Sequence, residues 1–298
     1  MKIAICISGQ PRTATDIVEN HKSTILNDSR LDVDTFMHLW WSDNHRGKVM
    51  RCHASERYPD EDMSKNMIEA YHPIKYLIED YKNFDQDFCI AHNYETWGKD
   101  LPQKFYDIFT PLVIYTFLSQ SFSVMQSTKL CYELGGYDIS IRLRSDVFFV
   151  KDIVKILKCI SPNDNEIYFQ SSMNGGHIYS GEHPNNPCDW FFCGTPKAVS
   201  HFSETWHTTI STIFKNGLLH NSQTIPAVAK KANLEIKLVD FGAHVYRQLN
   251  RDLSTPNGDP YFIPYQKYLD DFDSTSFSII GKIHDWPHYV KHVKFRRI

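Results

Sequence analysis

Apolar runs alternate with amphipathic segments along the first 250 residues, and this order predicts an α/β fold. Residues 2–7 form a nearly continuous apolar run, as expected of a strand buried on both faces of a parallel sheet. An amphipathic segment follows at about 13–26, and then a second strand at 33–40. Strand, helix and strand at this spacing predict a βαβ unit with a right-handed crossover.

The rest of the chain continues this alternation. The polar and charged stretch 42–66 is expected to be a long exposed loop, and 81–110 is irregular and aromatic. Gly135 and Gly136 are expected to end a long helix in the C-cap role. Helices are predicted at about 112–134, 151–159, 197–215 and 222–232, and strands at 74–79, 139–144, 166–169, 189–194, 234–240 and 243–249. We therefore expect one α/β domain with a mixed, Rossmann-like central sheet flanked by helices.

Length and composition agree with a folded protein of this kind. The chain has 298 residues, of which 42% are hydrophobic and 22% charged, so we expect a sizeable core rather than disorder. The net charge of −3 gives no general attraction for nucleic acid. Aromatic residues make up 14% of the chain, which favours either a thick aromatic core or a ligand groove.

The sequence also indicates a compartment. The start of the chain has too short an apolar run for a secretory signal, and no stretch of about 18 apolar residues is present. The seven cysteines form no CxxC pair, which is typical of reduced thiols. We expect a cytoplasmic protein whose basic and aromatic tail, 288–297, either stays solvated or contacts an anionic membrane surface peripherally.

The first candidate site follows the first strand. Ligands bind beyond the carboxyl ends of strands in open α/β sheets, and the amides at a helix start favour anions. Ser8, Gly9, Gln10 and Arg12 occupy that position. Gly9 lets the backbone approach a ligand closely, and Arg12 can pair with phosphate. The alternative is a plain turn with a surface arginine.

The second candidate closes the mid-chain strand at Arg144, Ser145 and Asp146. A carboxylate in this position can hold Mg²⁺ or Mn²⁺ beside phosphate oxygens, and such a metal can neutralise a leaving diphosphate. Arg142 and Arg144 share one side of the strand, so that side is cationic. The alternative is a structural arginine–aspartate pair in a turn. Literal DxD patterns elsewhere in the chain do not follow a strong mid-chain strand, and we treat them as chance.

The third candidate is Asp189, next to the aromatic residues Trp190, Phe191 and Phe192. Aromatic neighbours can raise a carboxylate pKa by desolvation or stack on a sugar ring. We therefore consider Asp189 a candidate general base, with a turn or helix-capping aspartate as the alternative. His38 and Trp40 are further candidates for stacking.

The fourth candidate is His244 with Arg247, which follow a late strand. A histidine in this position can complete a metal shell, and an arginine can compensate the charge of a diphosphate. A structural histidine is the alternative.

Together, these segments resemble a glycosyltransferase of the GT-A fold, of the small polysaccharide-building type found in bacteria and large DNA viruses. The resemblance covers roughly residues 1–250 and rests on four motifs in order. They are an SGQxR-type loop (Ser8, Gly9, Gln10, Arg12), a DxFxHxW strand (Asp34, Phe36, His38, Trp40), a YDxxIRxRxD run (Tyr137, Asp138, Ile141, Arg142, Arg144, Asp146) and a DxFxxG segment (Asp189, Phe191, Gly194).

The resemblance implies a nucleoside diphosphate sugar donor and a glycan or lipid-linked acceptor. It implies a donor half at 1–150 and an acceptor half at 151–250, followed by an extension at 251–298. Asp146, with His244, would hold Mn²⁺ or Mg²⁺. Arg144 stands where a full DxD motif has its first aspartate, so an arginine can instead pair directly with the diphosphate.

Two other functions fit the same residues. A nucleotidyltransferase, or another phosphate-handling α/β enzyme, would share the anion-binding loop and the carboxylate. A non-catalytic carbohydrate- or nucleotide-binding module would keep the aromatic groove without turnover. No nucleic-acid-binding motif is present, so nucleic acid is not an expected partner.

Overall fold

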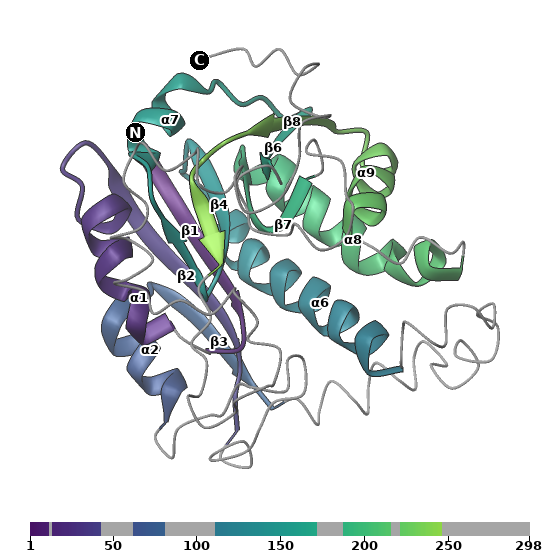
Figure 1. Cartoon of the computed structure of the whole chain (residues 1–298), viewed down its shortest axis with the longest axis horizontal. Helices are drawn as coiled ribbons and strands as arrows, with labels where there is room; N and C mark the ends of the chain where they lie inside the picture. Colours follow the sequence, from purple (N-terminus) through teal and green to yellow (C-terminus); the bar gives the residue numbers. More distant parts are fainter. Residues whose placement is uncertain (12–13, 43–61, 81–110, 172–186, 216–220, 246–298) are drawn as a thin grey trace, which may run out of the picture.

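One mixed sheet of seven strands, in the order β3-β2-β1-β4-β7-β6-β8, organises the protein (Figure 1). The structure is a computed structural model that describes residues 1–11, 14–42, 62–80, 111–171, 187–215 and 221–245. The strands of this sheet are β1 (Lys2–Gly9), β2 (Asp32–Trp40), β3 (Lys75–Glu79), β4 (Ile139–Arg144), β6 (Glu166–Ser171), β7 (Pro187–Gly194) and β8 (Glu235–Val239). This arrangement confirms the predicted single α/β domain with a mixed sheet.

Helices cover both faces of the sheet (Figure 1). They are α1 (Ala14–His21), the π-helical turn η1 (Lys22–Leu26), α2 (Met63–Tyr71), α6 (Pro111–Leu134), α7 (Ile153–Cys159), α8 (Pro196–Lys215) and α9 (Asn221–Lys231). Gly135 and Gly136 end α6 with positive φ angles of 70° and 82°, and the amide of Gly135 donates to Cys131 O at 3.0 Å. The predicted C-cap is therefore confirmed.

Alternation along β1 divides the core into two layers. Ile3, Ile5 and Ile7 pack with apolar residues of α1, α2 and α7 on one face. Ala4 and Cys6 point to the other face, where they pack against α6. Because both faces are covered, the whole interior of β1 is buried, as its continuous apolar run predicts.

The strand directions place the carboxyl ends of most strands at the same edge of the sheet. β1, β2, β3 and β4 run parallel to one another, and β6 and β8 are parallel to each other. β7 is antiparallel to both β4 and β6, so it alone runs in the opposite direction within this sheet. The carboxyl ends of the other six strands and the start of β7 therefore share one edge.

Two features differ from the predicted pattern. Helix α2 begins inside the segment predicted to be a loop, because Asp62 caps it by accepting a bond from the Lys65 amide at 3.1 Å. The chain after Asp146 forms a separate two-stranded sheet, in which β5 (Val147–Phe149) pairs antiparallel with β9 (Ala243–Val245). The loop at 43–61 and the irregular stretch 81–110 lie outside the described residues, as does the segment from 246 onward.

Side chains of α1 hold β5 along the edge that β9 does not occupy. The Asn20 amide donates to Phe149 O at 2.9 Å and accepts from Phe149 N at 2.8 Å. His21 donates through Nε2 to Val147 O and accepts through Nδ1 from the Tyr71 hydroxyl at 2.7 Å. These bonds satisfy the buried backbone of β5, the strand that directly follows Asp146.

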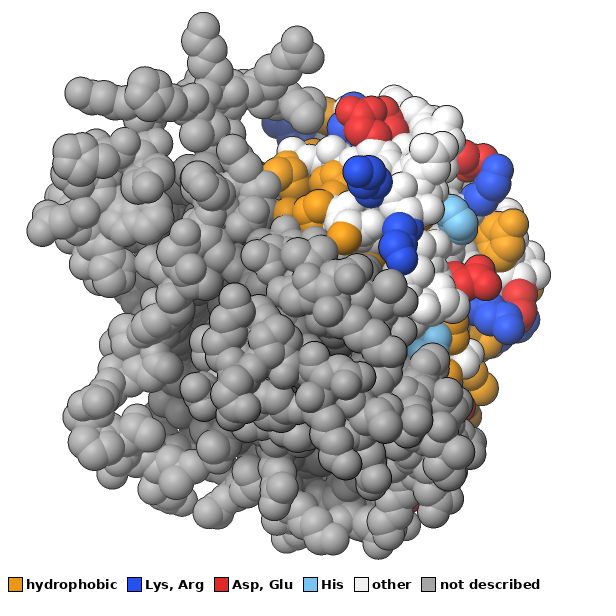
Figure 2. Space-filling view, turned by 90° about the vertical axis from the view of Figure 1, so that its right-hand side faces the viewer, with side chains coloured by type: hydrophobic (Ala, Val, Ile, Leu, Met, Phe, Trp, Pro, Cys, Tyr) orange, Lys and Arg blue, Asp and Glu red, His pale blue; other side chains and the backbone are white. Residues whose placement is uncertain are grey.

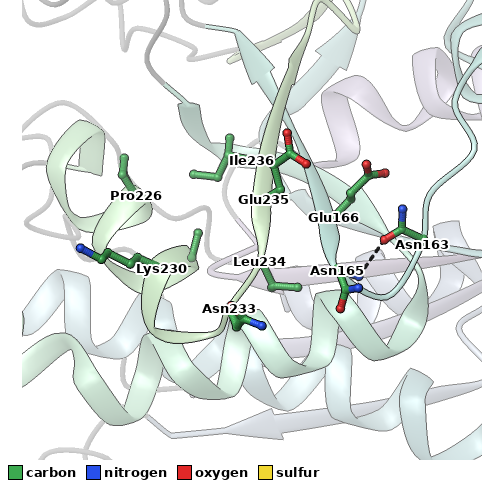
Figure 3. Close-up of a pocket in the computed structure, with 10 residues that line it drawn as sticks. Asn163, Asn165, Glu166, Pro226, Lys230, Asn233, Leu234, Glu235 and Ile236 are labelled. Atoms are coloured by element: carbon green, nitrogen blue, oxygen red, sulfur yellow. Dashed lines mark hydrogen bonds between the residues drawn. The ribbon is translucent and has the colours of Figure 1, made fainter.

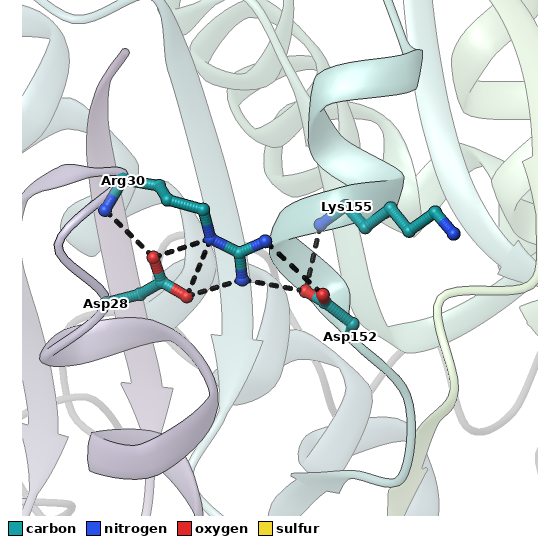
Figure 4. Close-up of polar contacts among 4 residues, drawn as sticks. All are labelled: Asp28, Arg30, Asp152 and Lys155. Atoms are coloured by element: carbon teal, nitrogen blue, oxygen red, sulfur yellow. Dashed lines mark hydrogen bonds and ion pairs between the residues drawn. The ribbon is translucent and has the colours of Figure 1, made fainter.

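A second polar contact joins the start of β2 to α7 (Figure 4). Arg30 donates through Nε to Oδ1 and through Nη2 to Oδ2 of Asp28, and its Nη2 also reaches Asp152 at 3.1 Å. Asp152 caps α7 by accepting from the Lys155 amide at 3.0 Å. The side-chain hydrogen bond from Arg30 lowers the pKa of Asp28 to about 2. Arg30 thus connects the loop after η1 to the beginning of α7.

The surface in Figure 2 carries charged side chains of both signs, interspersed with apolar ones where its residues are described. No helix in the described segments is long and apolar enough to cross a membrane. Five cysteines of the described segments, Cys6, Cys131, Cys159, Cys188 and Cys193, are free thiols.

Removing the Asn20 amide tests the attachment of β5. We expect Asn20→Ala to lower the free energy of unfolding by about 1–3 kcal/mol, since it leaves a buried amide and a buried carbonyl of Phe149 unpaired. Glu19→Ala, which removes an exposed ion pair of the same helix, is the control and should cost less than about 0.5 kcal/mol. Urea unfolding measures both. Equal effects would contradict this role of Asn20.

Acid should destabilise the protein through His21. Burial lowers the pKa of His21 from 6.5 to about 4, so the unfolded chain takes up the proton first as the pH falls. The stabilisation is therefore complete above pH 6.5 and is lost between pH 6.5 and 4, at roughly 1.4 kcal/mol per pH unit. Urea unfolding across this range should show the slope in the wild type and a reduced slope in His21→Gln. The exposed His201→Gln variant should keep the wild-type slope.

Candidate active site

The end of β1 brings the first two candidate segments together. Ser8 lies level with His38 of β2 and with Arg144 of β4 in the strand register. Gly9 has a φ of 114°, a backbone conformation that favours glycine. A Cβ on Gly9 would meet no atom within 4 Å, so the requirement there comes from the backbone angle and not from crowding. The chain thus turns out of the sheet at the edge where ligands bind in open α/β folds.

The turn after β4 is bonded to the loop after β1. Ser145 donates its hydroxyl to Gln10 O. Arg144 contacts both oxygens of Asp146, through Nε to Oδ1 and through Nη2 to Oδ2 at 3.2 Å. The Asp146 side chain is 1% exposed and the Arg144 side chain is 15% exposed, so the arginine is the more exposed member of the pair. The structural arginine–aspartate pair that the sequence allowed is therefore present.

This pair bears on the metal prediction. Both oxygens of Asp146 accept from Arg144, so a cation already occupies the place where a metal would bind. Among the residues that the structure describes, no three histidine, cysteine, aspartate or glutamate side chains are grouped to hold a metal. The described residues alone therefore do not form an Mn²⁺ or Mg²⁺ site at Asp146. The side chain of His244, the other predicted ligand, lies outside the description, so the metal site stays a prediction.

Arg142 lies two residues before Arg144 in β4 and is buried. Its Nη1 donates to the backbone carbonyl of Asp189, and its buried Nε has no hydrogen-bond partner among the described residues. Burial lowers the pKa of Arg142 to about 9, and the negative charge of Asp189 acts in the opposite direction. Arg142 therefore connects β4 to the start of β7 and adds positive charge beneath Arg144.

Asp189 lies inside β7, not in a turn or at a helix cap. It is 7% exposed, and the side-chain amide of Gln120 donates to its Oδ2. Gln120 belongs to α6, 69 residues earlier in the chain, and the sequence reasoning missed it. The sequence gives no signal for it, because the same helix carries other polar residues, Gln126 among them. Gln120 and Arg142 together hold Asp189 from two different elements.

The remaining predicted site residues lie partly outside the described segments. His244 pairs through its backbone with Phe148, so β9 places it two positions from Asp146 along the neighbouring strand. The side chain of His244 lies outside the description, and so do Arg12 and Arg247. The structure therefore brings Ser8, Gly9, Gln10, Arg144, Asp146 and Asp189 to one edge and adds the backbone of His244.

A polar network that the sequence did not indicate supports this edge. Gln170, at the end of β6, accepts from the Phe241 amide at 2.9 Å and from the Ala243 amide at 3.2 Å. Asp240 accepts from the Gly242 amide at 3.0 Å and pairs with Lys151. A Cβ on Gly242 would lie 2.6 Å from Lys151 Cγ, so a side chain there would collide with the lysine. This network fixes the turn into β9.

The prediction that aromatic side chains line a stacking groove here is wrong. Trp190, Phe191 and Phe192 are at most 2% exposed and belong to the two core clusters. His38 and Trp40 are likewise at most 2% exposed. His38 donates or accepts at Ser123 Oγ at 2.7 Å and contacts Glu79 at 3.1 Å. These residues stabilise the fold because the two-sided sheet buries both faces of its central strands.

A pocket lies at the amino ends of β6 and β8, at the edge of the sheet opposite the candidate active site (Figure 3). Asn163, Asn165, Glu166, Lys230 and Glu235 contribute polar groups to its wall. Asn163 accepts from the Asn165 amide at 2.9 Å, as the dashed line in Figure 3 marks. None of the predicted site residues lines this pocket, so it is separate from the candidate active site.

Comparisons with known proteins give structural neighbours only. No family model and no curated protein matches the sequence. A galactosyltransferase, LgtC, in complex with donor and acceptor sugar analogues matches with a TM-score of 0.39 and 11% identity over 83% of this chain and 87% of that one. Mouse xyloside xylosyltransferase 1 in its apo form matches with a TM-score of 0.39 and 9% identity, over 80% and 85% of the two chains.

An active-site mutant of LgtC matches with a TM-score of 0.41 and 8% identity, over 89% of this chain and 98% of that one. These neighbours are glycosyltransferases, the class that the sequence resembles. Because the identities and TM-scores are low, the functional argument rests on the residues of the site.

Proposed function

We propose that this chain is a glycosyltransferase that transfers a sugar from a nucleoside diphosphate sugar to a hydroxyl of a glycan or lipid-linked acceptor. One observation carries the proposal: the loop after β1 and the turn after β4 are bonded to each other through Ser145 and Gln10. Their backbone turns, Arg144 and Asp189 then meet at the carboxyl edge of the sheet, where open α/β folds bind nucleotides.

In this proposal, residues 1–150 bind the donor nucleotide and residues 151–250 contact the acceptor. The diphosphate lies over the loop of Gly9 and Gln10, near the start of α1, where helix amides favour an anion. Arg144 supports the diphosphate by turning part of its guanidinium from Asp146 toward phosphate oxygens, and Arg12 and Arg247 are further candidates for this role. Arg142 remains buried and keeps the potential beneath the site positive.

The chemical step assigned to Asp189 is proton removal. Its carboxylate accepts the proton of the acceptor hydroxyl while the acceptor oxygen forms a bond to the anomeric carbon. The bond from that carbon to the diphosphate oxygen breaks, and the nucleoside diphosphate leaves with the electron pair. Arg144 stabilises the charge that develops on the leaving group. This role of Asp189 belongs to an inverting reaction, so the anomeric configuration of the product tests it directly.

Arg144 should dominate donor binding. We expect Arg144→Gln to weaken the binding of UDP or GDP about 10–100-fold, since one charge-assisted contact contributes about 1.5–3 kcal/mol. The matched control is Arg30→Gln, which removes another arginine paired with a nearby aspartate but lies in the loop between η1 and β2. Isothermal titration calorimetry with and without Mn²⁺ measures both variants.

Three results of that titration would contradict the proposal or one of its parts. Binding of neither nucleotide by the wild type would remove the donor hypothesis. Wild-type affinity in Arg144→Gln would remove the arginine from the donor site. If the wild type bound the nucleotide only in the presence of Mn²⁺, and Asp146→Asn abolished that binding, Asp146 would hold a metal and the arginine would not replace it.

A turnover assay should distinguish the proposed base, Asp189, from Gln120, which donates to it. We expect Asp189→Asn to lower kcat roughly 100-fold or more, because general base catalysis contributes about that much. Gln120→Leu should lower kcat less, while Gln126→Leu on the same helix should leave it unchanged. The assay follows acceptor-dependent release of nucleoside diphosphate together with the mass of the glycosylated product. Release of pyrophosphate from a nucleoside triphosphate, with no sugar transfer, would favour a nucleotidyltransferase instead.

A further inference from the structure

Strand β3 presents an apolar edge to solvent. It is the outermost strand on its side of the described sheet, next to β2 (Figure 1). Tyr76, Leu77 and Ile78 form its centre and are 48%, 37% and 40% exposed. Ile74, just before the strand, is 47% exposed. Four exposed apolar side chains within five positions, three of them aliphatic, are unusual on a strand that has a neighbour on one side only in the described sheet.

Natural edge strands are normally protected against pairing. Charged side chains in the middle of the strand, proline and β-bulges are the usual means. The opposite edge of the sheet follows this rule, because Lys237 sits at the centre of β8 between Glu235 and Glu166, at 2.5 and 3.5 Å. β3 has no proline, its pairing with β2 is regular, and its only charges stand at its two ends. The two edges of one sheet are therefore built differently.

We propose that two copies of this chain associate through β3, which pairs with itself in antiparallel orientation about a two-fold axis at Leu77. The two seven-stranded sheets then form one continuous sheet. A two-fold contact of this kind is self-complementary: a residue that precedes Leu77 by some number of positions in one copy pairs with the residue that follows Leu77 by the same number in the other. This inference concerns assembly and does not depend on the proposed activity.

The strand sequence fits that register on both faces. Pairing about Leu77 places Lys75 of one copy opposite Glu79 of the other, and the symmetry repeats this ion pair at the far end. Tyr76 stands opposite Ile78 of the second copy, which is an aromatic–β-branched pair of the type that stabilises sheets. Leu77 meets its own equivalent on the axis. A shift of two residues would lose both ion pairs.

Glu79 is held in position for this contact. Its carboxylate lies 3.1 Å from Nε2 of the buried His38, and its backbone carbonyl accepts from the Trp41 amide at 3.0 Å. The Glu79 side chain remains 38% exposed, so it can receive a second partner. The order of this side chain before association lowers the entropy lost on forming the intermolecular pair.

The size of the contact sets the expected strength. A pair of five-residue strands is smaller than the roughly 800 Å² per partner of a standard interface. We therefore expect a reversible dimer with a dissociation constant in the range of about 1–100 μM. Sedimentation velocity of the full chain from about 1 to 200 μM should show a shift from monomer to dimer. A monomer at every concentration in this range would overturn the proposal.

A matched pair of variants tests the surface. Ile78→Lys places a charge in the centre of β3, and Leu238→Lys places one on β8 at a position of similar exposure, 37%. We expect Ile78→Lys to weaken the dimer at least 10-fold and Leu238→Lys to leave it unchanged. Thermal unfolding of each variant at a concentration where the wild type is monomeric checks that both fold. A folded Ile78→Lys variant that dimerises like the wild type would overturn the proposal.

Cross-linking tests the register. In Leu77→Cys the two introduced thiols face each other across the axis, and a mild oxidant such as copper phenanthroline removes two electrons and two protons to form a disulfide. In Tyr76→Cys each thiol faces Ile78 of the other copy, so we expect a much lower yield. Non-reducing electrophoresis, with the wild type as the background for native cysteines, measures both. Equal yields at the two positions would contradict pairing centred on Leu77.

Discussion

The parallel register of β1 between β2 and β4 is the constraint on which the candidate site depends. The two buried faces of β1 are packed differently, with isoleucines on one face and Ala4 and Cys6 on the other. A shift of β1 by one residue would therefore exchange the large and the small side chains between the two layers. That register places Ser8 level with Arg144 and leaves Gly9 to begin the turn out of the sheet. The bond from Ser145 to Gln10 then joins two loops whose positions the strands have already determined.

Charge is arranged in layers beneath this edge. Arg142 is fully buried, Asp146 is almost so, and Arg144 reaches partly into solvent. Burying charges costs free energy unless they are paired and hydrogen-bonded, and here the Arg144–Asp146 fork and the Arg142 contact to β7 supply part of that compensation. Within the described part of the chain, the Nε of Arg142 has no hydrogen-bond partner, so the described contacts supply only part of the compensation.

Most of the fold could be predicted from local pattern, and the two exceptions have different causes. The continuous apolar run of β1, the alternation of β4 and the two glycines after α6 are local signals, and each was interpreted correctly. The pairing of β5 with β9 joins segments almost 100 residues apart, so no local pattern reveals it. Helix α2 was missed because its cap at Asp62 lies within a run of charged residues.

Some residues of the candidate site could be predicted from local pattern, and others could not. Residues that end strands were found from the sequence, because strand ends are visible in the pattern. Gln120, Gln170 and Asp240 were missed, since each contacts a residue far away in the chain: Asp189, Phe241 and Lys151, respectively. The aromatic residues were misplaced for a different reason: composition counts rings but does not tell which face of a strand is covered, and here both faces are.

Gly242 has a consequence for how this chain tolerates change over evolution. Its φ of 67° and the nearness of Lys151 leave no room for a side chain, whatever ligand the neighbouring edge binds. Glycine should therefore persist at this position in homologous chains whose ligands have diverged, while the surrounding loops vary. An alignment of homologous chains in which this glycine is constant and Arg144 varies would show that the turn into β9 is conserved independently of the residue at position 144.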